Sequence, residues 1–301
     1  MRAVQIDRFG GPEVLEVRQV PDPAPAAGEL LVRVIASDIN PVDVKTRGHV
    51  YKTGMPPLPM TLGWDLAGVV TDGGGTTLRA GQRVIAMSPQ LATGAGTWAD
   101  LVALPASLVA PAPATVTLGE AATVPLAGLT AWQALDWLGP GNGERLLVTG
   151  GTGAVGGFAV QLARHRGITV DALVHPGAAA QTAVRLGASQ ALTSPAQVSA
   201  RGYDAVLDTV GADVAHGARD GGHYASVATE DGPLPNLAHR GISATMIQVH
   251  PDGAVLAELA RLVDAGALRL RVDSAFPLSG VRIAHERAMK GGLNGKVVLM
   301  Y

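Results

Sequence analysis

The chain has 301 residues, of which 47% are hydrophobic and 16% charged, and its formal net charge is −2. This length allows two hydrophobic cores, and the nearly neutral charge predicts neither a nucleic-acid-binding surface nor an acidic tail. The chain contains no cysteine, which excludes disulfides, a thiol nucleophile and cysteine-ligated zinc. Because no apolar run is as long as a membrane span or a signal-peptide core, we expect a cytoplasmic globular protein.

The first 115 residues are predicted to be rich in β-strands. The N-terminal segment MRAVQIDRFGG alternates as a strand does, and similar short stretches at 30–35, 67–71 and 83–86 are separated by Gly, Pro and Asp. A Pro- and Ala-rich passage at 107–117 is predicted to be a connector. From Leu118 the composition is typical of helices, and a helix is expected at 130–138.

The next segment combines a strand, a glycine-rich loop and a helix. A strand at 145–149 is followed by Gly150, Gly153 and Gly156, and the helix begins directly after them. Glycines at this spacing allow a tight turn, a close approach of the backbone to a pyrophosphate and close packing of the helix, in that order. The free N–H groups and partial positive charge of the helix N-terminus favour a diphosphate. The loop is therefore predicted to bind a dinucleotide, although a glycine triplet alone fits a purely structural turn equally well.

Further strands are expected downstream, with helical or loop segments between them, at 169–174, 190–193, 205–208, 223–227 and 242–247. This alternation predicts an α/β fold with a parallel, doubly wound sheet. Helices at 254–265 and 281–290 precede a last strand at 296–301, which we expect to pair with the N-terminal domain.

The end of the second strand bears on the choice of cofactor. An acidic residue at this position would bind both ribose hydroxyls of NAD, but this strand ends at His175. Without a carboxylate to repel it, a 2′-phosphate is tolerated, so NADP(H) is favoured over NAD(H). A solvated histidine at a strand end is an equally good interpretation of His175 itself.

Eight sequence phrases occur in one order along the chain: ASDINPVDVKTRG, LPMTLGWDLAGVV, RAGQRV, PLAGLTAWQAL, the glycine loop, RLGA, YDAVLDTVG and GKVVL. Together they resemble the medium-chain dehydrogenase/reductase superfamily, and within it the zinc-free quinone oxidoreductase branch, over essentially the whole chain. The resemblance implies a GroES-like β-rich domain at residues 1–115, completed by 266–301. It also implies a Rossmann dinucleotide-binding domain at 116–265 and a homodimer whose subunits join at the strand 242–247.

The resemblance also implies chemistry without zinc. In the zinc-bearing alcohol dehydrogenases, the catalytic ligands include a cysteine near the position of Asn40 and a histidine–glutamate pair after the equivalent of Gly63. Here Gly63 is followed by Trp64 and Asp65, and no cysteine is present.

Without a Lewis acid, a quinone or an enone is the better hydride acceptor, because conjugation spreads the arriving charge to a distant oxygen. The expected activity is therefore hydride transfer from NADPH to a quinone. An enoyl or enone reductase on the same scaffold is the nearest alternative, and a weakly catalytic nucleotide-binding protein is the third.

Three residues are expected to act on the substrate. Asn40 matches an asparagine that lies beside the nicotinamide in similar reductases and hydrogen-bonds the cofactor or the substrate oxygen; a turn residue before Pro41 is the alternative. Tyr51 matches a cleft tyrosine that donates a hydrogen bond to the reduced oxygen, and an exposed loop aromatic is the alternative. Lys45 stands where some relatives carry another tyrosine, and its charge suits a developing enolate.

The residues expected to bind the cofactor are Thr130, which matches a threonine near the nicotinamide ribose; the loop residues Gly150, Gly151, Thr152, Gly153, Ala154, Val155 and Gly156; His175; and Asp208, Val210, Gly211, Val227 and Ala228 at the carboxyl ends of two strands. Lys296 matches a basic residue of the last strand that reaches the 2′-phosphate in relatives, and a solvated lysine is the alternative. Two departures weaken the NADP(H) expectation, since Ala179 replaces a lysine and Ser194 a tyrosine.

Overall fold

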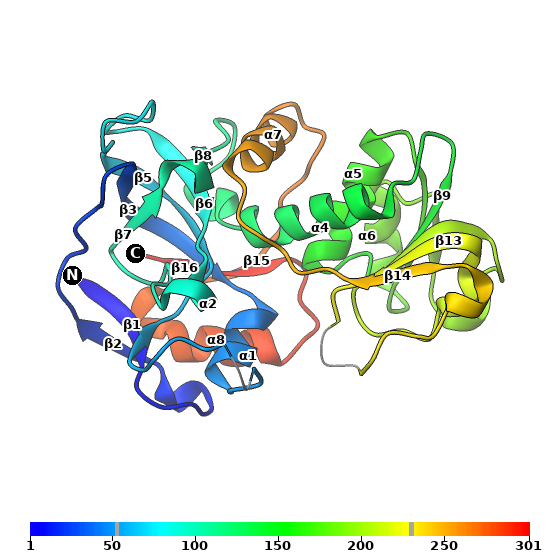
Figure 1. The fold of residues 1–301 in the computed structure, drawn as a ribbon, viewed down its shortest axis with the longest axis horizontal. Helices are drawn as coiled ribbons and strands as arrows, with labels where there is room; N and C mark the ends of the chain where they lie inside the picture. Colours follow the sequence, from blue (N-terminus) through cyan, green and yellow to red (C-terminus); the bar gives the residue numbers. More distant parts are fainter. Residues whose placement is uncertain (52–53, 229–231) are drawn as a thin grey trace. The chain divides into compact units, whose positions relative to one another are not determined.

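The computed structural model describes residues 1–51, 54–228 and 232–301, and they form two compact units (Figure 1). The first unit consists of Met1–Leu126, His250–Gly266 and Leu270–Tyr301, and the second of Ala127–Val249 and Ala267–Arg269. The first unit therefore extends past the boundary expected at residue 115. It also includes a helix, α7 (Gly253–Asp264), that the sequence had placed in the dinucleotide domain.

The first unit is built on two β-sheets. The larger follows the order β15 (Val272–Pro277), β16 (Lys296–Met300), β3 (Glu29–Ile39), β5 (Asp65–Asp72), β6 (Arg83–Met87) and β8 (Val109–Pro111), and β7 (Leu101–Pro105) also pairs with β3. The smaller follows the order β2 (Glu16–Gln19), β1 (Arg2–Ile6) and β4 (Met60–Thr61). The strand β8 lies within the passage that the sequence predicted to be a connector, and that prediction is wrong for these three residues.

The last strand returns to the first unit, as the sequence predicted. Strand β16, red in Figure 1, runs antiparallel to the blue strand β3, with Val297 opposite Ile39 and Leu299 opposite Ser37. Helix α8 (Val281–Met289) packs on β15 and β16. Its buried residues Val281, Ala284 and His285 recur at helical spacing, so one face of this helix joins the core around Trp98.

Four further helices belong wholly or partly to the first unit. They are α1 (Pro41–Arg47), α2 (Gln90–Thr93), α3 (Leu118–Ala121) and the start of α4 (Pro125–Leu138). Helix α3 begins where the composition predicted helices, and its N-terminus is capped by Thr117, whose hydroxyl accepts a hydrogen bond from the Glu120 N–H.

The second unit contains the predicted parallel sheet. Its order is β11 (Gln190–Leu192), β10 (Thr169–Leu173), β9 (Arg145–Thr149), β12 (Tyr203–Asp208), β13 (Ala218–Ser226) and β14 (Ser243–Met246), and neighbouring strands run parallel. The central strand β9 is buried from Leu146 to Thr149, and helix α5 (Ala154–His165) packs on it. Helix α5 also packs on β10 and beside α6 (Ala178–Leu186) (Figure 1). This sheet confirms the doubly wound α/β fold class.

In the described parts of the chain, we find no helix with the length and apolar character that a bilayer crossing requires.

Candidate active site

Two glycines of the loop after β9 are required by the loop's own conformation. Gly150 has φ +58°, a left-handed conformation that favours glycine, and a Cβ there would lie 2.5 Å from the Thr209 hydroxyl oxygen. A Cβ on Gly156 would lie 2.2 Å from the carbonyl oxygen of Gly150. The first turn of α5 therefore packs directly on the loop, and neither position tolerates a side chain.

Gly153 lies in a different environment. Its φ of −68° is open to any residue, it is exposed, and a Cβ there would contact only the Gly150 carbonyl oxygen, at 3.1 Å. Gly153 is also the N-cap of α5 and supplies no side-chain cap. The first N–H groups of a helix have no partner within it, so the space above Gly153 suits the diphosphate of a dinucleotide. These residues fit a nicotinamide cofactor.

The remaining candidates of the second unit gather at one edge of its sheet. Because β9, β10, β12 and β13 are parallel, their carboxyl ends meet there, and ligands bind outside this edge in folds of this class. His175 is exposed just beyond β10, Val210 and Gly211 are exposed beyond β12, and Val227 and Ala228 follow β13. Thr152, Ala154 and Val155 are half-buried in the loop and the start of α5. Thr130 is 5% exposed on α4, in the same unit.

Asp208 has a structural environment within this group. Its Oδ1 accepts hydrogen bonds from the Thr149 hydroxyl (2.5 Å) and from the N–H groups of Val210 and Ala212 (both 3.2 Å), and its Oδ2 accepts one from the Tyr224 hydroxyl (2.9 Å). Burial, together with the Asp208 charge, raises the pKa of Tyr224. The carboxylate therefore ties together the ends of β9, β12 and β13, and in this way it shapes the edge at which the cofactor is expected.

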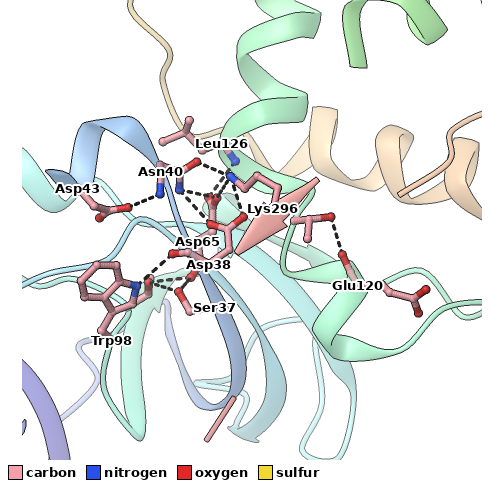
Figure 2. Close-up of polar contacts among 11 residues, drawn as sticks. Ser37, Asp38, Asn40, Asp43, Asp65, Trp98, Glu120, Leu126 and Lys296 are labelled. Carbon is pink, nitrogen blue, oxygen red and sulfur yellow. Dashed lines mark hydrogen bonds and ion pairs between the residues drawn. The ribbon is translucent and has the colours of Figure 1, made fainter. Parts of the chain in front are cut away.

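In the first unit, Asn40 is at the centre of a buried polar cluster (Figure 2). Asn40 directly follows β3 and is the N-cap of α1, and its backbone N–H donates to Asp43 Oδ2 at 2.8 Å. Its side-chain Nδ2 donates to Asp38 Oδ1 and to Asp65 Oδ2, each at 3.0 Å, and its Oδ1 accepts from the ammonium of Lys296. Asn40 is thus far more than a turn residue before Pro41.

Lys296 enters this cluster because of strand register. With Val297 opposite Ile39 in the antiparallel pair of β16 and β3, the preceding Lys296 lies next to Asn40. Its Nζ is 2.7 Å from Asp38 Oδ2 and 3.8 Å from Asp65 Oδ2, and the residue is 5% exposed. The structure therefore does not show a solvated strand lysine. A contact with a 2′-phosphate would require the ammonium to leave these partners.

The surrounding chain fixes the two carboxylates. The carbonyl of Asp65 accepts hydrogen bonds from the hydroxyls of Ser37 (2.5 Å) and Thr97 (2.7 Å), and the Trp98 indole donates to the carbonyl of Asp38 at 3.2 Å. The N–H of Leu126, in the first turn of α4, donates to Asp65 Oδ1 at 2.8 Å (Figure 2). The start of α4 therefore supplies a backbone donor that helps to hold the Asp65 side chain in place.

Burial dominates the acid–base properties of the cluster. It raises the pKa of Asp38 well above its usual value, against the opposing charge of Lys296, and raises the pKa of Asp43 to about 8. Burial by itself would lower the pKa of Lys296, but the charges of Asp38 and Asp65 outweigh it and raise that pKa above its usual value. Lys296 therefore keeps its ammonium charge, and this charge opposes the effect of burial on the pKa of Asp38.

The sequence had not identified Asp38, or the role of Asp65, as parts of this site. A signal was present in the sequence, because Asp38 closely follows the apolar run VIA and Asp65 precedes the apolar run LAGVV. The structure buries both aspartates completely, which is rare for acids without partners. The two other expected catalytic residues belong to the same unit as Asn40. Lys45 is half-buried on α1, and Tyr51 is half-buried beyond its end.

The residues around Asn40 do not fit a zinc ion. The oxygen atoms that could bind one, on Asp38, Asp65 and Asn40, already engage the Lys296 ammonium or the Asn40 amide, and the chain has no cysteine. Across residues 1–51, 54–228 and 232–301, no group of three or more His, Asp and Glu side chains could hold a metal ion.

Comparison with protein-family models gives two matches. Residues 26–114 match the alcohol dehydrogenase GroES-like domain, and residues 180–299 match the zinc-binding dehydrogenase family.

Individual proteins match over all or part of the chain. The chloroplast envelope quinone oxidoreductase homolog of Arabidopsis thaliana is 30% identical over 329 residues, which cover 99% of this chain and 98% of that protein. The 2-methylene-furan-3-one reductase of Solanum lycopersicum is 34% identical over 172 residues, which cover 55% of this chain and 44% of that protein.

Among solved structures, an NAD-dependent alcohol dehydrogenase superposes with a TM-score of 0.89 at 30% identity, and a mycobacterial protein in complex with NADPH with 0.86 at 28%; both matches cover 100% of either chain. The two-unit architecture, the glycine loop and these full-length matches all indicate the same family. The chain belongs to the medium-chain dehydrogenase/reductase superfamily of oxidoreductases.

Proposed function

We propose that this protein is a zinc-independent, NADPH-dependent reductase that transfers a hydride to a quinone. The observation that carries the proposal is the buried cluster around Asn40, in which the cation held by Asp38 and Asp65 is the ammonium of Lys296. A chemistry without a Lewis acid favours acceptors that delocalise the arriving charge, as quinones do. The quinone oxidoreductase homolog of Arabidopsis thaliana matches this chain over 98% of its own length, and this similarity supports a quinone as the acceptor.

The second unit would hold the cofactor. The N–H groups at the start of α5 would bind the diphosphate above Gly153, and the carboxyl ends of β10, β12 and β13 would line the remainder of the dinucleotide site. His175 and its neighbours place no carboxylate at the ribose position, which leaves room for a 2′-phosphate. When bound, the nicotinamide supplies the hydride.

The first unit would position the acceptor and stabilise its reduced oxygen. Both N–H groups of the Asn40 amide are committed to Asp38 and Asp65, so the donor to that oxygen must be another group. We assign this role to the Tyr51 hydroxyl, with Lys45 providing positive charge near the enolate. Asn40 retains an acceptor oxygen that orients a hydrogen-bond donor of the cofactor or substrate.

An enone reductase is the second candidate, and one observation favours it. The Solanum lycopersicum relative, whose name specifies a methylene-furanone as substrate, is 34% identical over 55% of this chain. An enone also spreads hydride charge to a distant oxygen, so the same site would serve both acceptors.

A panel of acceptors tests the proposal. We expect the purified protein to oxidise NADPH with 1,4-naphthoquinone, to act more slowly on an aliphatic enone, and to leave an aliphatic aldehyde unreduced. NADH in place of NADPH is expected to give a lower kcat/KM. Turnover of the enone alone would favour the second candidate. Turnover of the aldehyde alone, or none with any acceptor, would contradict the proposed function.

A further inference from the structure

The hydrogen-bonding capacity of the Asn40 side chain is almost fully used. A carboxamide has two N–H donors and an oxygen with two lone pairs. Both donors bind carboxylates, Asp38 and Asp65, at 3.0 Å, and one lone pair binds the Lys296 ammonium. Among the hydrogen bonds of the described residues, the second lone pair of the Asn40 oxygen is not used.

The charges around the amide set its orientation. If the carboxamide turned by 180° about its Cβ–Cγ bond, its oxygen would face two carboxylates and its N–H groups would face an ammonium. All three hydrogen bonds would be lost in a site where Asn40 is 2% exposed and both aspartates are 0% exposed. Water cannot replace such bonds in a buried site, so the observed orientation is strongly favoured.

Lys296 is the cation that the structure places against both Asn40 and Asp38. The N-terminus of α4 and the hydroxyls of Ser37 and Thr97 support Asp65, and the Trp98 indole donates to the Asp38 backbone. The Asn40 oxygen and the Asp38 Oδ2 atom share the same ammonium. Removing that ammonium would leave the carboxylates uncompensated and one side of the amide without a partner.

We propose that Lys296 is a positioning residue for Asn40. Its ammonium, anchored by Asp38 and Asp65, holds the carboxamide so that it offers a ligand one acceptor lone pair and no donor. The ligand group that Asn40 recognises is then a hydrogen-bond donor, such as an amide N–H or a hydroxyl, and never a bare carbonyl oxygen. The catalytic consequence of this role rests on the proposed function, but the geometry itself does not.

Nuclear magnetic resonance tests the geometry without any assay of activity. The chain has only four asparagines, so selective ¹⁵N-asparagine labelling gives four side-chain amide pairs, and the pair missing from Asn40→Ser belongs to Asn40. We expect the Asn40 amide protons to exchange with solvent at least about tenfold more slowly than those of the exposed Asn142, because both are donated to buried carboxylates. Equal exchange rates in the unaltered protein would overturn the proposal, whatever the fate of any variant.

Variants of Lys296 test its role. Lys296→Met should accelerate Asn40 amide exchange and lower kcat about tenfold, the effect of losing one charged hydrogen bond, while KM for NADPH stays within about twofold. Lys296→Arg should recover part of kcat because it keeps the charge. Lys290→Met, on an exposed lysine at the end of α8, is the matched control and should resemble the unaltered protein.

The outcomes separate this inference from the proposed function. An unaltered protein that reduces no acceptor but shows a protected Asn40 amide refutes the proposed function and leaves the geometry standing. An active protein in which Lys296→Met changes neither amide exchange nor kcat refutes the positioning role. If Lys296→Met does not fold, Asp65→Asn, which weakens one acceptor of the amide, is expected to accelerate the same exchange, and an unchanged rate there contradicts the proposal.

Discussion

At the scale of single residues, the glycines of the loop after β9 have separable roles. Gly156 lies against the Gly150 carbonyl and has no room for a side chain, whereas Gly153 is exposed and has an ordinary backbone conformation. The spacing of the three glycines predicted a dinucleotide loop, and the structure now indicates which glycine serves the fold and which leaves space for a ligand.

Gly153→Asp is expected to weaken NADPH binding at least about a hundredfold and to leave the chain folded, because the added carboxylate would occupy and repel the diphosphate site. Gly156→Ala should instead lower the free energy of unfolding by about 1–3 kcal/mol, since its Cβ would overlap the Gly150 carbonyl oxygen. Isothermal titration and thermal unfolding measure the two effects. Gly141→Asp, on an exposed turn of the same unit, controls for added charge; unchanged NADPH affinity in Gly153→Asp would argue against the site.

His285 gives the first unit a distinct response to acid. It is 0% exposed beside Trp98, and burial, with the charge of Arg47, lowers its pKa to about 3 from 6.5. Between these two values the unfolded chain binds a proton that the folded chain does not. Stability from this residue is therefore complete above about pH 6.5 and is lost as pH falls toward 3, by roughly 1.4 kcal/mol per pH unit.

We expect His285→Leu to flatten this dependence. Asp43, with its pKa raised to about 8, acts in the opposite direction, because its stabilising proton is lost as pH rises toward 8. The difference in unfolding free energy between the variant and the unaltered protein cancels the contribution of Asp43 and isolates His285. Denaturant unfolding at pH 7, 5.5 and 4 provides it, and a difference that does not change with pH would contradict a neutral buried histidine.

The residues of the Asn40 cluster mark the limit of what sequence alone could predict at this scale. Asn40 was identified through a sequence phrase, but its partners come from β5 and β16, and Lys296 is 256 positions away. The register of β16 on β3 brings Lys296 to Asn40, and the pairing of β5 with β3 brings Asp65 there. From the sequence alone, a buried lysine in a short apolar strand cannot be told from a solvated one. Its partners become apparent only when the neighbouring strand is known.

At the scale of elements, long periodic segments were predicted well and short ones poorly. The strand, loop and helix from β9 to α5 lie where the sequence placed them, because apolar strands covered on both faces and a glycine turn leave a strong local pattern. Strand β8 was missed inside a Pro-rich passage. Its three residues form a strand only because β6 offers an unpaired edge, a tertiary effect that local composition does not record.

The edge strand β14 is where we propose that two copies of the chain join. It pairs only with β13 among the described strands, and alternate N–H groups, including that of Ile247, bond to β13, so the N–H of the exposed Ala244 points to the open side. Light scattering is expected to give twice the 30.6 kDa of the chain. Ala244→Pro should shift the mass toward the monomer and leave NADPH binding intact, and an unaltered protein that is monomeric would contradict this interface.

At the scale of the whole molecule, the two units divide the proposed reaction between them. The second would bind the diphosphate at the N-terminus of α5, and the first presents the Asn40 amide in contact with the Lys296 ammonium and two aspartates. The superfamily and the fold class were predictable from the sequence, because the order of short motifs along the chain indicates both. The polar network around Asn40 was not predictable, since it depends on four segments that only the folded sheet brings together.

The most direct test of this account is the rate of NADPH oxidation by 1,4-naphthoquinone before and after dialysis against 1,10-phenanthroline and EDTA, with the metal content measured by mass spectrometry in parallel. We predict an unchanged kcat and far less than one zinc per chain. A rate that falls on chelation and returns on addition of zinc would contradict the central claim that the ammonium of Lys296, and no metal ion, is the cation of this site.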